Sequence, residues 1–171
     1  MSTTANTHRV AALVEQLGKA IGTREVSIAT AESCTGGMLS GAIVANPEVS
    51  GALERGLVVY SLDAKCELLD LDRAEVERCQ GVSRAVAEGM AASALDRSHA
   101  DIAVAITGFA GPQEDEEEVG LVHIACAQRG GATAHKEEHL GDLGRAGVCE
   151  AAVAVAVEML IDAVGEFVTG T

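Results

Sequence analysis

The spacing of apolar residues predicts helices that alternate with strands along most of the chain. Apolar positions three and four residues apart, from Val10 to Ile21, predict an amphipathic helix over residues 8–21. The β-branched run that follows predicts a strand over 25–31. By the same patterns, further helices are expected at 35–45, 63–70, 72–79, 83–95 (with Ser83 as N-cap) and 145–164, and further strands at 56–61, 101–107, 120–127 and 132–140.

The order of these elements predicts an α/β protein. Helices alternate with parallel-type strands first, and a hairpin with its turn at Arg129-Gly130-Gly131 comes later. This order predicts a three-layer α/β/α sandwich around a mixed, mainly parallel sheet. The segment 145–164 is rich in Ala and Val and apolar on most sides, so we expect a buried helix, although its surface also fits a homo-oligomer contact.

Length and composition limit the class of protein. The 171 residues contain no repeat and no long linker, so we expect one domain over 1–171 with its core at about 8–165. Aromatic residues make up only 2% of the chain, which predicts a core of Ala, Val, Leu and Ile. The formal net charge of −14 opposes nucleic-acid and anionic membrane partners. No apolar run has the roughly 20 residues needed to span a bilayer, and the polar start predicts a cytoplasmic protein.

No metal site or disulfide framework is expected from the cysteines and histidines. The five cysteines are scattered and form no CxxC pair, as a structural zinc site or a disulfide scaffold would require. In a strand, His135, Glu137 and His139 share one face, but no further convergent ligand is visible, so an exposed sheet face is expected there. His123 lies in an apolar strand and is expected to be a hydrogen-bonded core histidine.

The sequence Ala29-Thr30-Ala31-Glu32-Ser33-Cys34-Thr35-Gly36-Gly37 is the first candidate for chemistry. It joins an apolar strand to a helical pattern, and the start of a helix offers unpaired N–H donors and partial positive charge. Ser33 and Cys34 lie beside these donors. The segment therefore fits acyl chemistry or phosphate binding, and it fits a purely structural strand-to-helix turn equally well.

Two further apolar segments also end in small polar clusters, at Tyr60-Ser61 and Thr107-Gly108. The carboxyl ends of strands in open α/β sheets form ligand crevices, so the three clusters are expected to converge. Lys65 follows the second cluster, near a positive helix end, where its neutral form is favoured and can take a proton from a serine. From the residues alone, two alternatives remain open. Lys65 also fits an ordinary solvated lysine on a helix, and Tyr60 also fits a strand residue with its hydroxyl at the surface.

Four blocks carry a resemblance to a known family. ATAESCTGG, VVYSLDAK, GVSRAVAEGMA and AITGFAGP, in this order and spacing, resemble the CinA C-terminal domain family, whose characterised members are nicotinamide mononucleotide deamidases. The resemblance covers about residues 8–165 and implies an α/β/α sandwich. Many relatives carry an extra N-terminal domain, so the chain is expected to be the stand-alone form.

The resemblance implies hydrolysis of the carboxamide of nicotinamide mononucleotide, a small-molecule nucleotide, to nicotinate mononucleotide and ammonia without a metal or redox cofactor. It implies that Ser33 is the nucleophile, rather than its rival Cys34, and that Lys65 is the base, assisted by Tyr60. The remaining substrate contacts that it implies are backbone donors near Thr35, Gly36 and Gly37 for the oxyanion or phosphate, pocket residues Ser61, Thr107 and Gly108, and Arg145 for the phosphate.

The chain departs from the family pattern at three places. Relatives usually have a glycine-rich loop where this chain has the acidic run 114–118, which we expect to be solvated and to face away from the pocket. Leu62 replaces an Asn of the family, and Cys149 stands near the place of a second Arg. These changes leave two alternatives open: a nucleotide-binding or regulatory relative without turnover, and an amidase for another small amide.

Overall fold

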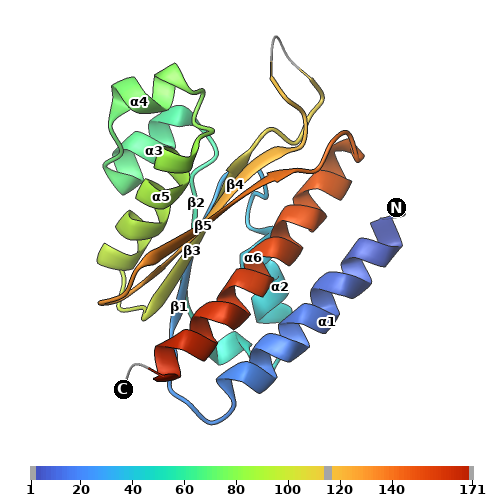
Figure 1. The fold of residues 1–171 in the computed structure, drawn as a ribbon, viewed down its shortest axis with the longest axis vertical. Helices are drawn as coiled ribbons and strands as arrows, with labels where there is room; N and C mark the ends of the chain where they lie inside the picture. Colours follow the sequence, from blue (N-terminus) through green and yellow to red (C-terminus); the bar gives the residue numbers. More distant parts are fainter. Residues whose placement is uncertain (1–2, 114–116, 170–171) are drawn as a thin grey trace.

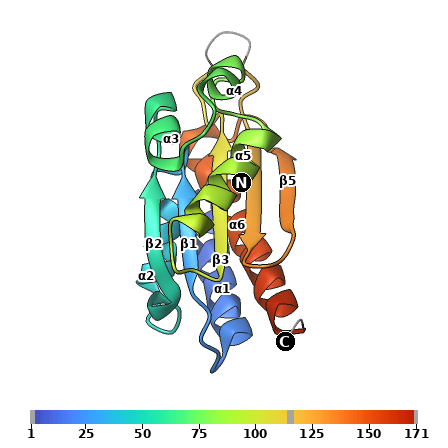
Figure 2. The ribbon, with the colours of Figure 1, turned by 90° about the vertical axis from the view of Figure 1, so that its left-hand side faces the viewer.

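A five-stranded sheet forms the centre of the structure, a computed structural model that describes residues 3–113 and 117–169. The strands lie side by side in the order β2-β1-β3-β4-β5 (Figure 2). Their bounds are β1 Ile28–Glu32, β2 Leu53–Val58, β3 Ile102–Gly108, β4 Leu121–Gln128 and β5 Thr133–His139.

Helices cover both faces of this sheet, which confirms the predicted three layers (Figure 1). On one side lie α1 (Thr3–Ile21), α2 (Met38–Ala45) and α6 (Gly144–Thr169), and on the other side α3 (Leu62–Leu69), α4 (Arg73–Arg78) and α5 (Arg84–Asp96). A short 3₁₀ turn, η1 (Ser50–Ala52), precedes β2.

The sheet is mixed, as predicted, and its parallel part is confined to one half. β1 pairs in parallel with β2 and with β3, whereas β3 with β4 and β4 with β5 are antiparallel. The description "mainly parallel" therefore applies to β1, β2 and β3 only. Because these three strands point the same way, their carboxyl ends meet at one edge of the sheet (Figure 2).

The core is built from small aliphatic residues, as the composition predicts. On the sheet face under α5, Ala29, Ala103 and Ala125 are fully buried, so the helix and its Met90 pack close to the strands. The opposite face buries larger side chains, among them Ile28, beneath α1, α2 and α6. Residues 148–157 of α6 are all buried, which confirms the predicted buried helix.

Several element boundaries differ from the predicted ones. α1 begins at Thr3 and not at residue 8, and α6 continues to Thr169. β2 spans Leu53–Val58 and not 56–61, because its parallel register pairs Leu53 with Ile28 and ends where β1 ends. Tyr60 and Ser61 therefore lie in the loop before α3.

The predicted helix at 35–45 begins three residues later, at Met38. Gly36 and Gly37 have φ of 58° and 99°, in the left-handed region that favours glycine, so residues 35–37 form a turn. Two other local predictions are confirmed. Ser83 Oγ accepts the Val86 N–H at 3.2 Å, and the β4–β5 hairpin turns at residues 129–131.

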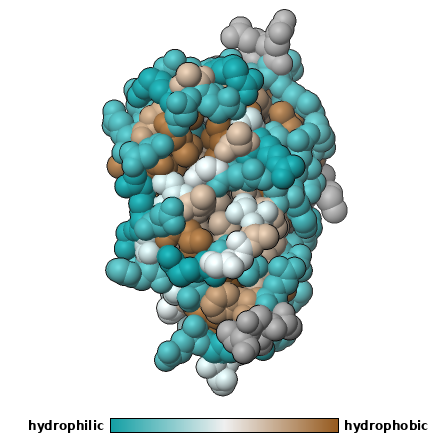
Figure 3. Space-filling view, turned by 60° about the vertical axis from the view of Figure 1, so that its left-hand side comes forward, coloured by the Kyte–Doolittle hydropathy of each residue, from teal (hydrophilic) through white to brown (hydrophobic). Residues whose placement is uncertain are grey.

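On the face shown in Figure 3, hydrophilic residues surround several hydrophobic patches. Some large apolar side chains are exposed, such as Val44 on α2 and Leu68 on α3. Within the described part of the chain, no helix is both long enough and apolar enough to cross a membrane.

Candidate active site

Ser33 and Lys65 are brought together at the carboxyl ends of two neighbouring parallel strands. Ser33 follows β1, and its N–H donates to the Ile106 carbonyl of β3 at 2.9 Å. Lys65 lies near the start of α3, the helix after β2. The Lys65 ammonium donates to Ser33 Oγ at 2.8 Å and to the Val59 carbonyl at 3.3 Å. Both predicted catalytic residues are buried, with 6% of Ser33 and 2% of Lys65 exposed.

The surroundings of Lys65 favour its neutral form. Its two hydrogen-bond acceptors are uncharged, and it forms no ion pair with any residue that the structure describes. Burial is the largest influence and lowers the pKa of the Lys65 amine below its ordinary value. Nearby thiols, Cys34 first among them, act in the opposite direction but do not cancel this shift. A neutral amine beside a hydroxyl can accept the hydroxyl proton.

Gly81 supports this arrangement and was missed in the sequence. Its φ is 73°, and a Cβ at this position would lie 3.2 Å from Lys65 Nζ. Its carbonyl accepts the Thr107 hydroxyl at 2.6 Å. Gly81 begins the block GVSRAVAEGMA, so the signal was present, but nothing in that block indicates contact with Lys65.

The turn between β1 and α2 is organised by Glu32, a second residue that sequence reasoning missed. The Glu32 carboxylate is fully buried and accepts five hydrogen bonds at 2.7–3.1 Å. The donors are the hydroxyls of Thr35 and Ser40 and the backbone N–H groups of Gly37, Leu39 and Ser40. The chain's own carboxylate thus occupies the positive end of α2.

This contact corrects the predicted use of Thr35, Gly36 and Gly37. The Gly37 N–H donates to Glu32 at 3.1 Å, and the Gly36 N–H donates to the Ser33 carbonyl at 3.0 Å. Both donors are therefore occupied and do not face an external phosphate. Of the three predicted donors, the Thr35 N–H alone makes no hydrogen bond to a described residue.

A cavity of about 460 Å³ opens over the Ser33–Lys65 pair. Its lining comes from the segments that follow β1 and β2, the start of α3, the segment between α4 and α5, the end of β3 with the loop after it, and the start of α6. The lining residues are Ser33, Cys34, Tyr60, Ser61, Leu62, Lys65, Gln80, Val82, Thr107, Gly108, Phe109, Ala110, Gly111, Pro112, Glu117 and Arg145. The three polar clusters predicted to converge at one crevice do so.

Tyr60 is not placed as an assistant to the base. Its side chain is 57% exposed, and its hydroxyl accepts a hydrogen bond from the Arg145 guanidinium. Arg145 also donates to the Gly111 carbonyl. Tyr60 forms no hydrogen bond with Ser33 or Lys65. Arg145 lies on the cavity wall, where the sequence predicted it.

The other predicted pocket residues lie at the cavity but have structural tasks. Ser61 caps α3, because its Oγ accepts the Ala64 N–H at 3.0 Å. The Thr107 hydroxyl is occupied by Gly81. Gly108 allows β4 to approach, since a Cβ there would lie 2.7 Å from the Leu121 carbonyl.

Cys34 is unsuited to act as a nucleophile. Burial raises the pKa of the Cys34 thiol to about 12, so the thiol stays protonated at neutral pH, and the Lys65 amine contacts Ser33 Oγ and not this thiol. Cys149, at the place of the second arginine of the family, donates its S–H to the Cys34 carbonyl at 3.2 Å. It therefore packs beneath the site and does not reach into the cavity.

The predicted orientation of the acidic run is wrong at Glu117. This residue is half-buried and lines the cavity. Glu118 points elsewhere, toward His139, with Glu118 Oε1 and His139 Nδ1 2.6 Å apart. Residues 114–116 lie outside the described residues.

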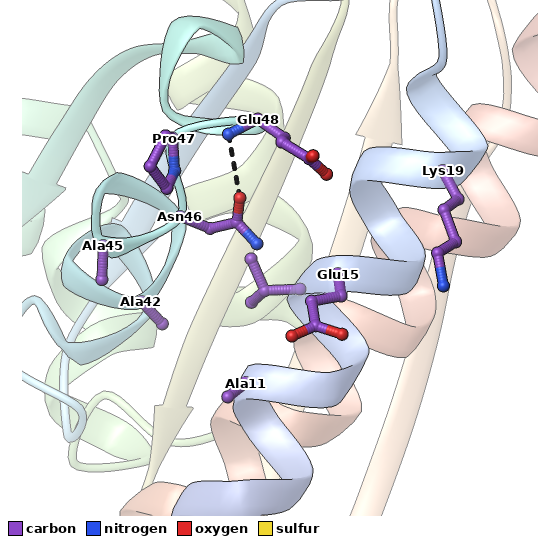
Figure 4. A pocket seen from close by; sticks show the side chains of 9 residues that line it. Ala11, Glu15, Lys19, Ala42, Ala45, Asn46, Pro47 and Glu48 are labelled. Carbon is purple, nitrogen blue, oxygen red and sulfur yellow. Dashed lines mark hydrogen bonds between the residues drawn. The ribbon is translucent and has the colours of Figure 1, made fainter.

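A second hollow, of about 640 Å³, lies between α1 and the end of α2 and carries no comparable chemistry (Figure 4). Glu15 and Lys19 project toward it from α1, and Asn46 Oδ1 accepts the Glu48 N–H at 2.9 Å on the other side. No serine, cysteine or histidine lines it. Although this hollow is larger, the Ser33–Lys65 cavity is the site that can perform a reaction.

His123 is the hydrogen-bonded core histidine that the sequence predicted, whereas His135, expected on an exposed sheet face, is half-buried. His123 is buried and shares a hydrogen bond of 3.1 Å with His135, while His139 contacts Glu118 and Glu137. Among residues 3–113 and 117–169, no group of three or more His, Cys, Asp or Glu residues has a geometry that could hold a metal ion.

Comparison with known proteins identifies the family. The family model described as the CinA C-terminal domain matches residues 10–164. The chain belongs to this family. A CinA-like protein of Chlorobium limicola is 43% identical over 117 residues, which cover 67% of this chain and 27% of that protein. A CinA-like protein of Mycolicibacterium vanbaalenii is 44% identical over 136 residues, which cover 78% of this chain and 32% of that protein. The chain spans about a third or less of the length of these CinA relatives.

Solved CinA structures share the whole fold. The competence/damage-inducible protein CihA from Agrobacterium tumefaciens has a TM-score of 0.85 and 39% identity, covering 90% of this chain and 94% of that chain. A competence or damage-inducible protein from Enterobacter asburiae has a TM-score of 0.82 and 34% identity, covering 91% of this chain and 98% of that chain. The α/β/α sandwich is therefore the fold of the CinA C-terminal domain.

Proposed function

We propose that the chain is an amidohydrolase that converts nicotinamide mononucleotide to nicotinate mononucleotide and ammonia, with Ser33 as nucleophile and Lys65 as base. The observation that carries the proposal is the 2.8 Å contact between Lys65 Nζ and Ser33 Oγ at the base of the cavity. The choice of substrate rests on the resemblance to CinA deamidases. We also infer a cytoplasmic location, which the five free cysteines support.

The proposed reaction follows the Ser–Lys form of acyl transfer. The neutral Lys65 amine takes the Ser33 proton as Ser33 Oγ forms a bond to the amide carbon. The tetrahedral intermediate then breaks its C–N bond, and Lys65 returns the proton to the leaving nitrogen, which departs as ammonia. Water then attacks the resulting ester as Lys65 takes its proton; the bond between the acyl carbon and Ser33 Oγ breaks, Lys65 returns the proton to Ser33 Oγ, and the acid product loses its own proton to solvent and leaves as the carboxylate.

Two groups are assigned to the charges of the reaction. The Thr35 N–H follows the nucleophile closely in sequence and has no partner among the described residues, which supports a role as oxyanion donor. Apart from Lys65, Arg145 is the basic side chain in the cavity lining. Its guanidinium donates to the Tyr60 hydroxyl and the Gly111 carbonyl, which fix its position. We therefore assign the binding of the substrate phosphate to Arg145.

The test is the release of ammonia and nicotinate mononucleotide by the purified protein, with the Ser33→Ala variant as control. Both products are expected in a one-to-one ratio from the parent, and neither above background from the variant. A well-folded parent that releases no ammonia from this substrate would contradict the proposed substrate.

A second candidate is an amidase for another small amide, or a nucleotide-binding relative without turnover. The observation that favours the amidase for another small amide is the occupation of the start of α2 by Glu32, which removes part of the predicted phosphate site. A panel of nicotinamide, nicotinamide riboside and aliphatic amides separates the two forms. Ammonia from a phosphate-free amide supports the other amidase, whereas ligand binding without any ammonia supports the binding relative.

A further inference from the structure

Two opposite charges line the active-site cavity, and neither has a charged partner among residues 3–113 and 117–169. Within these ranges the Arg145 guanidinium donates to the Tyr60 hydroxyl and the Gly111 carbonyl, which are both neutral. The Glu117 carboxylate forms neither a hydrogen bond nor an ion pair with any residue in the described ranges, although the side chain is half-buried and lines the cavity. Four other half-buried carboxylates, those of Glu54, Glu75, Glu88 and Glu158, each pair with an arginine.

The two charges come from separate parts of the fold. Glu117 lies on the segment that leads into β4, and Arg145 lies in the first turn of α6. They do not pair with each other, although both line the same cavity as Ser33 and Lys65. Once Lys65 is neutral, Glu117 and Arg145 are the charged side chains that remain in the lining. The cavity therefore presents one negative and one positive wall to a ligand.

We propose that Glu117 is a specificity-determining residue that selects amides whose amide-bearing ring or group carries a positive charge. Arg145 takes the anionic end of the same molecule, so the substrate class is a zwitterion. This inference rests on the proposed function, since the pyridinium ring of nicotinamide mononucleotide carries such a charge and its phosphate is anionic. A half-buried carboxylate has lost part of its contact with water, and no neighbouring cation among the described residues compensates this loss. A cationic ligand group therefore binds beside it more favourably than beside a fully solvated carboxylate.

The same placement affects the product. Hydrolysis replaces a neutral carboxamide with a carboxylate and so adds a negative charge to the bound molecule. This charge arises in the cavity that Glu117 lines, where like charges repel. Glu117 therefore favours the binding of substrate over that of product, and the product is expected to bind more weakly than the substrate.

The test compares two ligands that differ in ring charge and share the phosphate. Nicotinamide mononucleotide has a cationic ring, and its reduced dihydro form has a neutral one. Their dissociation constants are measured by calorimetry in the Ser33→Ala background, where turnover does not interfere, with and without Glu117→Gln. We expect Glu117→Gln to raise the dissociation constant of the oxidised form about tenfold and that of the reduced form less than twofold.

Glu118→Gln is the matched control, because the adjacent carboxylate contacts His139 and is absent from the cavity lining. It is expected to change neither constant. Equal changes for both ligands, no change for either, or no binding of the oxidised form would overturn the inference. If the discrimination is found but the parent releases no ammonia, the proposed function fails and the charge selection stands. If ammonia is released but Glu117→Gln has no effect, only the inference on Glu117 fails.

Discussion

Glu32 and Lys65 are both buried charged residues at the carboxyl edge of the sheet, yet their surroundings differ sharply. The Glu32 carboxylate is fully buried and accepts five hydrogen bonds from the turn and the start of α2. Lys65 is almost as deeply buried, but its hydrogen bonds to described residues are with one hydroxyl and one carbonyl. No carboxylate compensates its charge within the described part of the chain.

The difference separates a structural charge from a reactive one. A buried carboxylate with a full set of donors holds the backbone in one arrangement and has no capacity left for a substrate. A buried amine with few partners changes its protonation easily, as the lowered pKa of Lys65 indicates. Glu32 holds the turn that follows Ser33 in one conformation. Lys65 contacts the Ser33 hydroxyl that this turn positions.

The largest effect is expected for Lys65→Met, which removes the amine and keeps an unbranched side chain that is one heavy atom shorter. Turnover should fall about 10³- to 10⁴-fold, because the general base is lost. Stability at neutral pH should rise by about 1 kcal/mol, since burial disfavours the charged amine. Ammonia release and thermal unfolding measure the two effects.

The pH dependence of stability sharpens this prediction. The pKa of Lys65 is lowered by folding, so between that lowered pKa and the ordinary value the folded state binds fewer protons than the unfolded state. The stability of the parent therefore rises with pH in this window. The advantage of Lys65→Met should be greatest below the lowered pKa and shrink as the pH approaches 10.5. A constant difference across this range would mean that Lys65 carries no burial penalty.

The next effect is expected for Glu32→Gln, measured by denaturant unfolding. The amide keeps the shape of the side chain but turns an N–H₂ group toward backbone donors, so the free energy of unfolding should fall by about 2–4 kcal/mol. Glu15→Gln, an exposed change on α1, is the control and should stay within about 0.5 kcal/mol. A loss below about 1 kcal/mol for Glu32→Gln would contradict the structural role of Glu32.

The smallest effect is expected for Tyr60→Phe. The Tyr60 hydroxyl contacts Arg145 and neither member of the Ser33–Lys65 pair, so kcat should fall less than about tenfold. If either constant changes more than this, it should be KM, which should increase because Arg145 is assigned to the substrate phosphate. Steady-state kinetics provide the measurement. A fall in kcat of about 10³-fold would show instead that Tyr60 assists Lys65, as the resemblance implies.

The sequence predicted the features that depend on local pattern and strand direction. Alternating elements predicted the three layers, and polar residues at the strand ends predicted the convergence of Ser33, Lys65 and Thr107 on one cavity. The N-cap at Ser83 could be predicted because serine is a preferred residue immediately before a helix, where its side-chain oxygen accepts an unpaired backbone N–H of the first turn.

Features that depend on distant contacts were not readable. The end of β2 is set by its register with β1 and not by its own residues. Tyr60 and Arg145 are 85 positions apart, and their contact depends on where α6 begins. Glu32 resembled one more polar residue of a loop, because no local pattern reveals which carboxylate fills a helix start.

The central claim is that Ser33, activated by buried Lys65, is the nucleophile rather than its neighbour Cys34. The most direct measurement is ammonia release from nicotinamide mononucleotide by the parent, Ser33→Ala and Cys34→Ala at equal concentration, with each fold checked by thermal unfolding. The account predicts turnover by the parent and by Cys34→Ala, and at least a roughly 10³-fold loss in Ser33→Ala. Turnover that survives in folded Ser33→Ala and disappears in folded Cys34→Ala would contradict it.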